Sequence, residues 1–238
     1  MAGTIRRMPK NIINKNEKAK RGTINYLTVD GISLLLRQPD LSTLKGVRDL
    51  AMLALMYDTG ARVQEIIDLT PASLRLNRPC TINLKGKGNK ARIVPLMDEE
   101  VVHLKNYMVK NNLLEVYATM YPLFYNTWKE KLTRAGITHI LHKYAAMARE
   151  KDTALIPEKI SCHSLRHSKA MHLLQAGVNL VYIRDILGHQ SVTTTELYAR
   201  VDSKHKREAI EKAFVNVVNK ESPMWVNNED LLTWLKTF

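Results

Sequence analysis

A single change in the spacing of apolar residues constrains the fold most. From Leu27 onward, apolar residues recur mainly every three or four positions, the spacing of one face of an α-helix. Between residues 81 and 94 they alternate instead, on either side of a Gly-rich turn at 86–89, which predicts a β-hairpin with a basic tip. The sequence therefore predicts a mainly helical fold with one small antiparallel sheet.

Capping residues predict where the helices begin and end. Thr28 is a candidate N-cap for a helix that Pro39 ends, and Gly60 ends a second helix, so that Arg62 lies at the mouth of a third. We expect helical chain from Pro95 through Met147 and a helix over 164–176. Two more follow: one from Asn179 to Gly188 that buries Leu180, Ile183, Ile186 and Leu187, and one that starts at a Thr193/Glu196 capping box and carries Tyr198.

Charge indicates the kind of partner. The 238 residues include 36 Lys+Arg and 23 Asp+Glu, a formal net charge of +13, which points to a polyanion such as nucleic acid. No apolar run approaches the ~20 residues of a membrane-spanning helix. Two cysteines cannot form a disulfide framework, which favours a reducing compartment, so we expect a cytoplasmic, nucleoid-associated protein.

The chain divides into three expected parts. Residues 25–220 form the main domain, and residues 221–238 form a short tail helix that docks on a neighbouring protomer or, alternatively, on its own domain. Residues 1–24 form a basic arm, expected to bind DNA phosphates unless it is only a solvated tail, through Arg6, Arg7, Lys10, Lys18, Lys20 and Arg21.

Four polar segments stand out against the helical pattern. Each alone has a simpler structural explanation: a surface charge, a turn, a helix cap or a core tyrosine. Together they supply arginine, lysine and histidine donors for phosphate oxygens and a tyrosine that can form a covalent phosphoryl intermediate. The segments are 60–65, the hairpin tip 85–90, 163–167, and 187–191 leading to Tyr198.

Other chemistries fit these residues less well. His163 and His167 have the spacing of a zinc-protease helix, but Ser164 stands where that motif needs Glu. Segment 85–90 lacks the pattern of a nucleotide-binding loop, and no acidic cluster suits a pair of metal ions. Cys162 is interpreted as a small buried residue rather than a nucleophile, and Tyr182 as a packing residue.

Taken in order, these motifs resemble the tyrosine recombinases, the group of phage and transposon integrases. The similarity spans about residues 25 to 215 and keeps order and spacing. It is carried by Gly60-Ala61-Arg62-Val63-x-Glu65-Ile66, by Gly86-Lys87-Gly88-Asn89-Lys90 with Arg92-Ile93-Val94-Pro95-Leu96, by His163-x-Leu165-Arg166-His167, and by Leu187-Gly188-His189-x-Ser191-x-x-Thr194-Thr195-x-x-Tyr198.

The resemblance implies roles for these residues. Tyr198 would attack a DNA phosphate and form a 3′-phosphotyrosyl link, while Lys87 protonates the leaving 5′-oxygen. Neither a metal nor another cofactor is implied. Arg62, Arg166 and His189 would bind the scissile phosphate, His163 would help to move protons, Glu65 would support the Arg62 loop, and Lys85, Lys90 and Arg92 are expected to contact DNA.

The resemblance also implies a site-specific recombinase that works as a dimer on each DNA site and as a tetramer in the synapse, with possible DNA-bending accessory factors. One departure is that about 25 residues precede the first helix, so a complete N-terminal core-binding domain is not expected. Two alternatives stay open at this stage: a type IB topoisomerase with the same active-site logic, and a DNA-binding regulator that has lost the chemistry.

Overall fold

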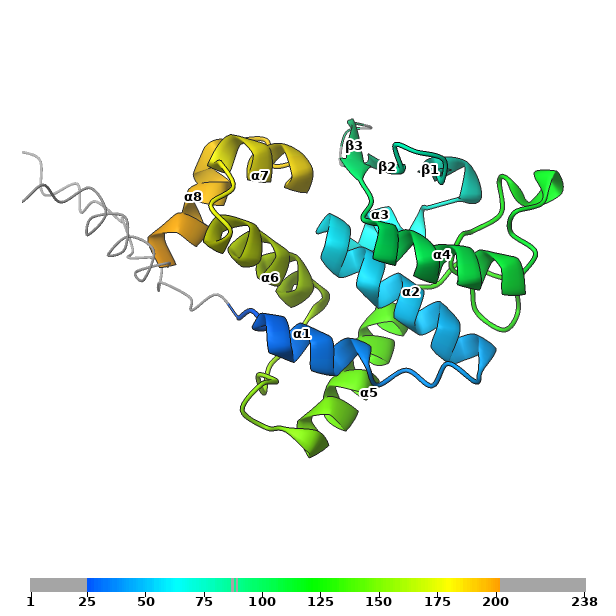
Figure 1. Cartoon of the computed structure of the whole chain (residues 1–238), viewed down its shortest axis with the longest axis horizontal. Helices are drawn as coiled ribbons and strands as arrows, with labels where there is room; N and C mark the ends of the chain where they lie inside the picture. Colours follow the sequence, from blue (N-terminus) through cyan, green and yellow to red (C-terminus); the bar gives the residue numbers. More distant parts are fainter. Residues whose placement is uncertain (1–24, 87, 89, 202–238) are drawn as a thin grey trace, which may run out of the picture.

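The computed structural model describes residues 25–86, 88 and 90–201. The predicted arm and tail lie outside this range. No helix in the described range is long and apolar enough to span a membrane. Figure 1 shows its main elements, which are α1 (Val29–Leu36), α2 (Leu44–Thr59), α3 (Val63–Ile67), β1 (Leu74–Arg75), β2 (Thr81–Lys85), β3 (Ala91–Pro95), α4 (Asp98–Lys110), α5 (Arg134–Lys151), α6 (Cys162–Gln175), α7 (Leu180–Leu187) and α8 (Val192–Val201).

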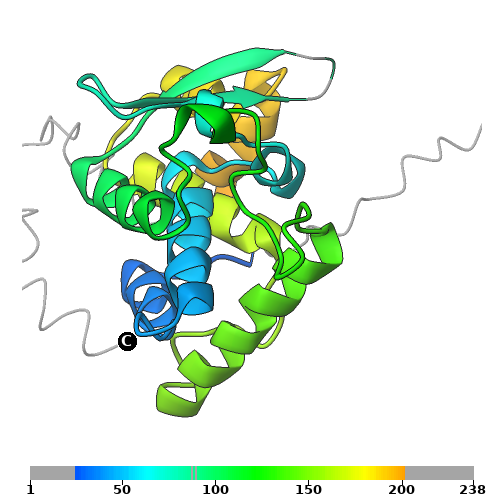
Figure 2. The same ribbon diagram turned by 90° about the vertical axis from the view of Figure 1, so that its right-hand side faces the viewer.

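Helix α2 forms the centre of the main core. Every residue from Leu50 to Met56 is buried, so the helix is enclosed on all sides rather than amphipathic. It packs against α4 and α6 and touches α1 and α3, and Figure 2 shows it upright in the middle of the molecule with the sheet above it. The predicted stop at Gly60 is confirmed, because this residue caps α2 in the left-handed conformation at φ 58°.

The predicted hairpin is confirmed and gains a third strand. Strands β2 and β3 pair antiparallel with Ile82 opposite Val94, and both side chains are buried in the core. The two-residue strand β1 pairs with the other edge of β2 and gives the order β1-β2-β3. A strand this short has no alternation of its own, so only its tertiary pairing reveals it.

The expected continuous helical stretch from Pro95 to Met147 is wrong. Helix α4 ends at Lys110, and α5 begins only at Arg134. Asn112 and Lys129 adopt positive φ angles of 56° and 65°, which no helix accommodates, and Pro122 lies between them. The intervening chain contains one turn of 3₁₀ helix at Val116–Ala118, and it is anchored by buried Leu123 and Phe124.

Helices α6, α7 and α8 form a small second core beside the main one (left in Figure 1). Its buried members are Ala170, Met171, Ile183, Leu187 and Tyr198. Helix α6 begins two residues before the expected start.

Three expectations in this region are wrong in detail. Leu180 and Ile186 are only partly buried, because the short α7 presents just Ile183 and Leu187 inward. Helix α8 begins at Val192, before the expected Thr193/Glu196 capping box, and Ser191 Oγ accepts the hydrogen bond from Thr193 N. Tyr182 is 65% exposed and is no packing residue.

Three helices begin with the same four-residue pattern, Thr-x-x-Gly. In α1, α2 and α5 the threonine hydroxyl caps the helix by accepting a hydrogen bond from the backbone N–H of the glycine, at 3.0–3.1 Å. The glycines are not equivalent, however. A methyl group on Gly46 would lie 1.9 Å from the carbonyl oxygen of Asp40, whereas one on Gly136 would meet only Thr133 Oγ1, at 3.3 Å.

Gly46→Ala should therefore lower the free energy of unfolding by about 1–3 kcal/mol, although alanine is intrinsically the better helix former. The cause is that the Asp40 backbone must move to admit the methyl group. Urea denaturation measures the change. Gly136→Ala is the matched control and should change the free energy by less than about 1 kcal/mol. Equal effects of the two substitutions would contradict this packing argument.

Candidate active site

The carboxyl end of α7 gathers three arginines. The last carbonyl groups of a helix have no partner within the helix and carry the negative end of its dipole, so they attract cations. Three successive carbonyls here accept hydrogen bonds from arginines of three different segments. Arg92 Nε donates to Ile186 O at 2.8 Å, Arg166 Nη2 to Leu187 O at 2.6 Å, and Arg62 Nη2 to Gly188 O at 3.0 Å.

Arg166 is the most buried of the three. It is 4% exposed, and its Nη1 also donates to Gly60 O at 2.6 Å, so that it joins the end of α2 to the end of α7. Burial, followed by the charges of Arg62 and Arg92, lowers the pKa of Arg166 to about 10. The guanidinium is therefore still charged at neutral pH.

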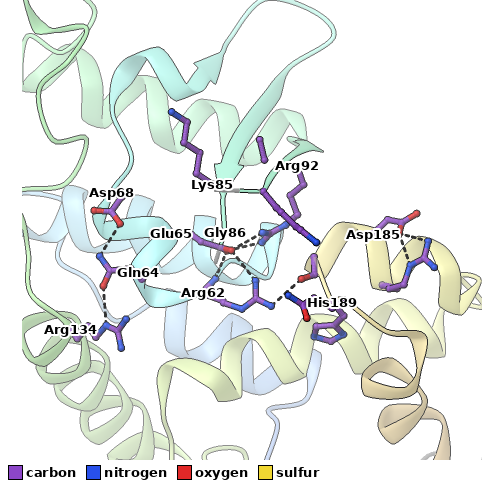
Figure 3. Close-up of a pocket in the computed structure, with 15 residues that line it drawn as sticks. Arg62, Gln64, Glu65, Asp68, Lys85, Gly86, Arg92, Arg134, Asp185 and His189 are labelled. Carbon is purple, nitrogen blue, oxygen red and sulfur yellow. Dashed lines mark hydrogen bonds and ion pairs between the residues drawn. The ribbon is translucent and has the colours of Figure 1, made fainter. Parts of the chain in front are cut away.

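Glu65 is the counter-charge of the cluster. Its buried carboxylate is bound bidentately by Arg92 at 2.7 and 2.7 Å and by Arg62 Nη1 at 3.0 Å, and it accepts the Arg62 backbone N–H at 2.8 Å (Figure 3). Burial alone would raise the pKa of Glu65, but these hydrogen bonds outweigh it and hold the pKa below its ordinary value. Glu65 thus stays ionised and fixes two arginines.

Gly188 allows this close packing. It caps α7 in the left-handed conformation at φ 65°, and a side chain there would approach Arg92 Nη1 to 2.9 Å. Its neighbour His189 points its Nδ1 at Thr195 Oγ1, 2.9 Å away. Burial and then the charges of nearby arginines lower the pKa of His189 to about 4, so the ring is neutral at pH 7.

Tyr198 lies behind this cluster, on α8. It is 4% exposed, and its ring stacks on His189 with centroids 6.4 Å apart. Its hydroxyl lies 2.9 Å from His167 Nδ1. Burial raises the pKa of Tyr198, against the opposing effect of the Arg166 charge, so the phenol keeps its proton at neutral pH.

A cleft of about 870 Å³ opens in front of the arginines, between the hairpin and the end of α7. Arg62, Arg92 and His189 line its inner wall, and exposed Lys85 and Lys90 lie at the hairpin side. Arg134, whose Nε donates to Gln64 Oε1 at 3.0 Å, and Arg184 also line the cleft. This cluster of fixed cations in a concave surface suits a phosphate group.

The fold brings most of the expected catalytic residues together. Arg62, Arg166, His189 and Tyr198 converge, with Glu65 in support. His163 is exposed, with its ring 6.2 Å from that of His167. Lys87 and the arm residues lie outside the described residues.

Two residues behave differently from the expectation. The Arg92 side chain is only 11% exposed, and its Nε, Nη1 and Nη2 atoms each donate a hydrogen bond within the protein, so contact with DNA stays a prediction for it. The sequence predicts no catalytic role for His167, although its ring contacts Tyr198 in the structure. Its position next to Arg166 in the sequence could have indicated that His167 lies near the site. Only the packing of α8 on α6 shows that it contacts Tyr198. Cys162 is buried with its pKa raised by burial, which fits its interpretation as a structural residue.

Comparison with known proteins gives the family. The model of the phage integrase family matches residues 25–205. Tyrosine recombinase XerD of Staphylococcus epidermidis is 36% identical over 199 residues, covering 83% of this chain and 65% of the relative. Tyrosine recombinase XerC of Thermodesulfovibrio yellowstonii is 34% identical over 215 residues, covering 89% and 69%.

Solved structures agree with this match. The XerH site-specific recombinase bound to a palindromic difH substrate, in a post-cleavage complex, superposes with a TM-score of 0.69 at 27% identity over 82% of this chain and 55% of that one. The catalytic domain of bacteriophage HP1 integrase shares the fold, with a TM-score of 0.55 and 23% identity over 84% of this chain. The chain belongs to the phage integrase family, and its match covers 56–65% of the length of the curated XerD relatives.

The lowered pKa of His189 predicts a loss of stability in acid. Between about pH 6.5 and pH 4 the unfolded chain takes up a proton on this histidine that the folded protein excludes, so the free energy of unfolding falls as the pH falls. His189→Gln should make this fall shallower, as measured by urea denaturation across the range. Above pH 7 the free energies of unfolding of the two proteins should differ by a constant amount. If the free energies of unfolding of the two proteins ran parallel down to pH 4, the lowered pKa of His189 would be contradicted.

Proposed function

We propose that this chain is the catalytic part of a site-specific DNA recombinase that cleaves and rejoins duplex DNA through Tyr198. The observation that carries the proposal is the convergence of Arg62, Arg166 and His189 on one site with Tyr198 behind it. Family membership and the similarity to the XerH recombinase, whose structures contain its difH substrate, support it.

The chemistry follows from these groups. As the Tyr198 oxygen attacks phosphorus, negative charge develops on the non-bridging phosphate oxygens. Arg62 and Arg166, held in place by backbone carbonyls, are fixed before the reaction and stabilise that charge without reorganisation. His189, neutral at pH 7, adds a hydrogen bond. The phosphotyrosyl ester conserves the energy of the broken bond, so strands can be rejoined without ATP.

Several parts of the proposal concern residues outside the described range. Lys87 protonates the leaving 5′-oxygen from the hairpin tip, and the arm at residues 1–24 contacts phosphates. The tail helix at residues 221–238 docks on the next protomer, which builds the tetramer in which strands exchange through a four-way junction. A location in the cytoplasm with the nucleoid completes the proposal.

A covalent capture experiment tests the activity. The protein is incubated with nicked duplexes of randomised sequence, in which cleavage near the nick releases a short fragment and traps the adduct. The wild-type protein should retain DNA through denaturing electrophoresis, and sequencing of the retained DNA gives the recognised duplex. Tyr198→Phe should bind that duplex with nearly unchanged affinity yet retain none after denaturation, because only the phenolic oxygen is lost.

The outcomes separate the candidate functions. Binding by the wild-type protein without any adduct would show a DNA-binding regulator and contradict the proposal. With two copies of the captured duplex on separate DNAs, exchanged products indicate a recombinase, whereas relaxation of supercoiled DNA without exchange would indicate a topoisomerase. An adduct formed by Tyr198→Phe would show that another residue is the nucleophile.

A second test separates DNA contacts from positioning residues. Lys85 and Lys90 are exposed at the cleft, whereas Arg92 is tied to Glu65 and Ile186. Lys85→Ala and Lys90→Ala should each reduce the slope of log affinity against log salt by about one. Arg92→Ala should leave the slope unchanged but slow adduct formation by roughly 100-fold, because Arg62 loses its fixed geometry. A reduced slope for Arg92→Ala would make it a direct phosphate contact.

A further inference from the structure

The contact between His167 and the nucleophile calls for a function, because nothing in the family resemblance assigned one to this residue. His167 Nδ1 lies 2.9 Å from Tyr198 Oη, at the distance of a good hydrogen bond. The rings are tilted by 56° with centroids 5.7 Å apart, so the contact is made edge to edge by the polar atoms rather than by ring stacking.

The surroundings of Tyr198 create a need for a proton acceptor. The side chain is only 4% exposed within the apolar cluster of α6, α7 and α8, so little of it is open to bulk water that could take its proton. Burial also raises the pKa of the phenol, which therefore reaches the reaction un-ionised. A group of the protein must accept the proton as the oxygen attacks.

His167 is suited to accept it. Burial, and then the charges of His163 and Arg166, lowers the pKa of His167, so that the imidazole is neutral at pH 7. A neutral imidazole with its hydrogen on Nε2 offers an unprotonated Nδ1 to the phenol. The lone pair that accepts the hydrogen bond is the one that would take the proton.

The other two histidines of the site are placed less well for this step. Nδ1 of His189 is directed at Thr195 Oγ1, and its ring lies nearly parallel to that of Tyr198, at 12°. His163 is exposed, and its described ring contact is with His167 rather than with Tyr198. Among the described residues, His167 is the base with an atom at hydrogen-bond distance from Tyr198 Oη.

We propose that His167 is a catalytic residue that accepts the phenolic proton of Tyr198 during cleavage and returns it during rejoining. In cleavage, the bond from Tyr198 Oη to phosphorus forms while the bond from phosphorus to the 5′-oxygen breaks. The phenolic proton moves to His167 Nδ1, and the 5′-oxygen takes a proton from the general acid. Rejoining reverses each transfer. This inference rests on the proposed function and takes over part of the role expected for His163.

The experiment uses the full chain and the duplex obtained by covalent capture, with the bridging 5′-oxygen replaced by sulfur. This leaving group needs no general acid, so the rate of adduct formation reports on the nucleophile. His167→Ala should form adduct at least about 100-fold more slowly than the wild type. Added imidazole should restore part of the rate in proportion to its concentration, because it can occupy the vacated space and take the proton.

His167→Asn separates proton transfer from positioning. Its side-chain amide can accept a hydrogen bond from the phenol but cannot take its proton, so this variant should be as slow as His167→Ala. His172→Ala is the matched control. His172 lies on the same helix, and its Nδ1 makes the same 2.9 Å contact, with Tyr57 Oη. Its loss should leave the rate within about threefold of the wild type, without any response to imidazole.

The outcomes are distinct. A wild-type rate in His167→Ala or His167→Asn, a faster rate in either, or a slow His167→Ala variant that folds and binds DNA but does not respond to imidazole would each overturn the assignment of His167. Circular dichroism and DNA affinity establish that the variants fold and bind. If the wild-type protein itself forms no adduct with any captured duplex, the proposed function fails first, and that result is obtained before any His167 variant is measured.

Discussion

The carboxyl end of α7 holds the candidate site together, because side chains from several segments of the chain bind to it. Three carbonyl groups that have no partner within the helix accept hydrogen bonds from arginines of the α2–α3 loop, the hairpin and α6. Each arginine would repel the others if they were brought together without such acceptors. The helix dipole and the carbonyl oxygens make the assembly stable, and they fix the distances between guanidinium groups that would otherwise sample many rotamers.

Glu65 fixes two of these arginines and neutralises only part of their positive charge. One carboxylate opposes three guanidinium groups, so the described cluster keeps a positive excess that an incoming phosphate can neutralise. Removing the carboxylate would leave Arg62 and Arg92 without their partner. The resulting loss in the free energy of unfolding would exceed what the intact ion pairs contribute to it. The same residue therefore serves stability and the proposed chemistry, and its low pKa keeps it in the required charged form.

Tyr198 lies in a different environment from the arginines and lysines. Tyr198 lies in the apolar second core, whereas Arg62 and the hairpin lysines face the open cleft. This separation keeps the phenol protonated, while the cleft beside the arginines stays open. His167 and His189, neutral because they are half-buried beside arginines, lie between the two environments. This contrast between the two environments explains how one small site can contain both a strong positive charge and an un-ionised phenol.

The sequence by itself predicted most elements, and it named four side chains that the fold brings together, Arg62, Arg166, His189 and Tyr198. Gly60, Asn179 and Gly188 have the expected capping roles, because caps are local chemistry, and the alternation at residues 81–94 does form the hairpin. The loop at 111–133 was wrongly predicted to be helical, because the apolar residues scattered along it have nearly helical spacing. Strand β1 escaped as well, because two residues carry no pattern of their own.

What only the tertiary structure decided is the role of each charged residue. Arg92 and Lys90 look equivalent in the sequence, two cations near the same turn. In the fold one is drawn inward by Glu65 and the Ile186 carbonyl, while the other faces solvent. Likewise, the pairing of His167 with Tyr198 joins positions 31 residues apart through the packing of α8 on α6. Such contacts depend on the direction of a side chain across an interface between helices, and no local pattern in a sequence encodes that direction.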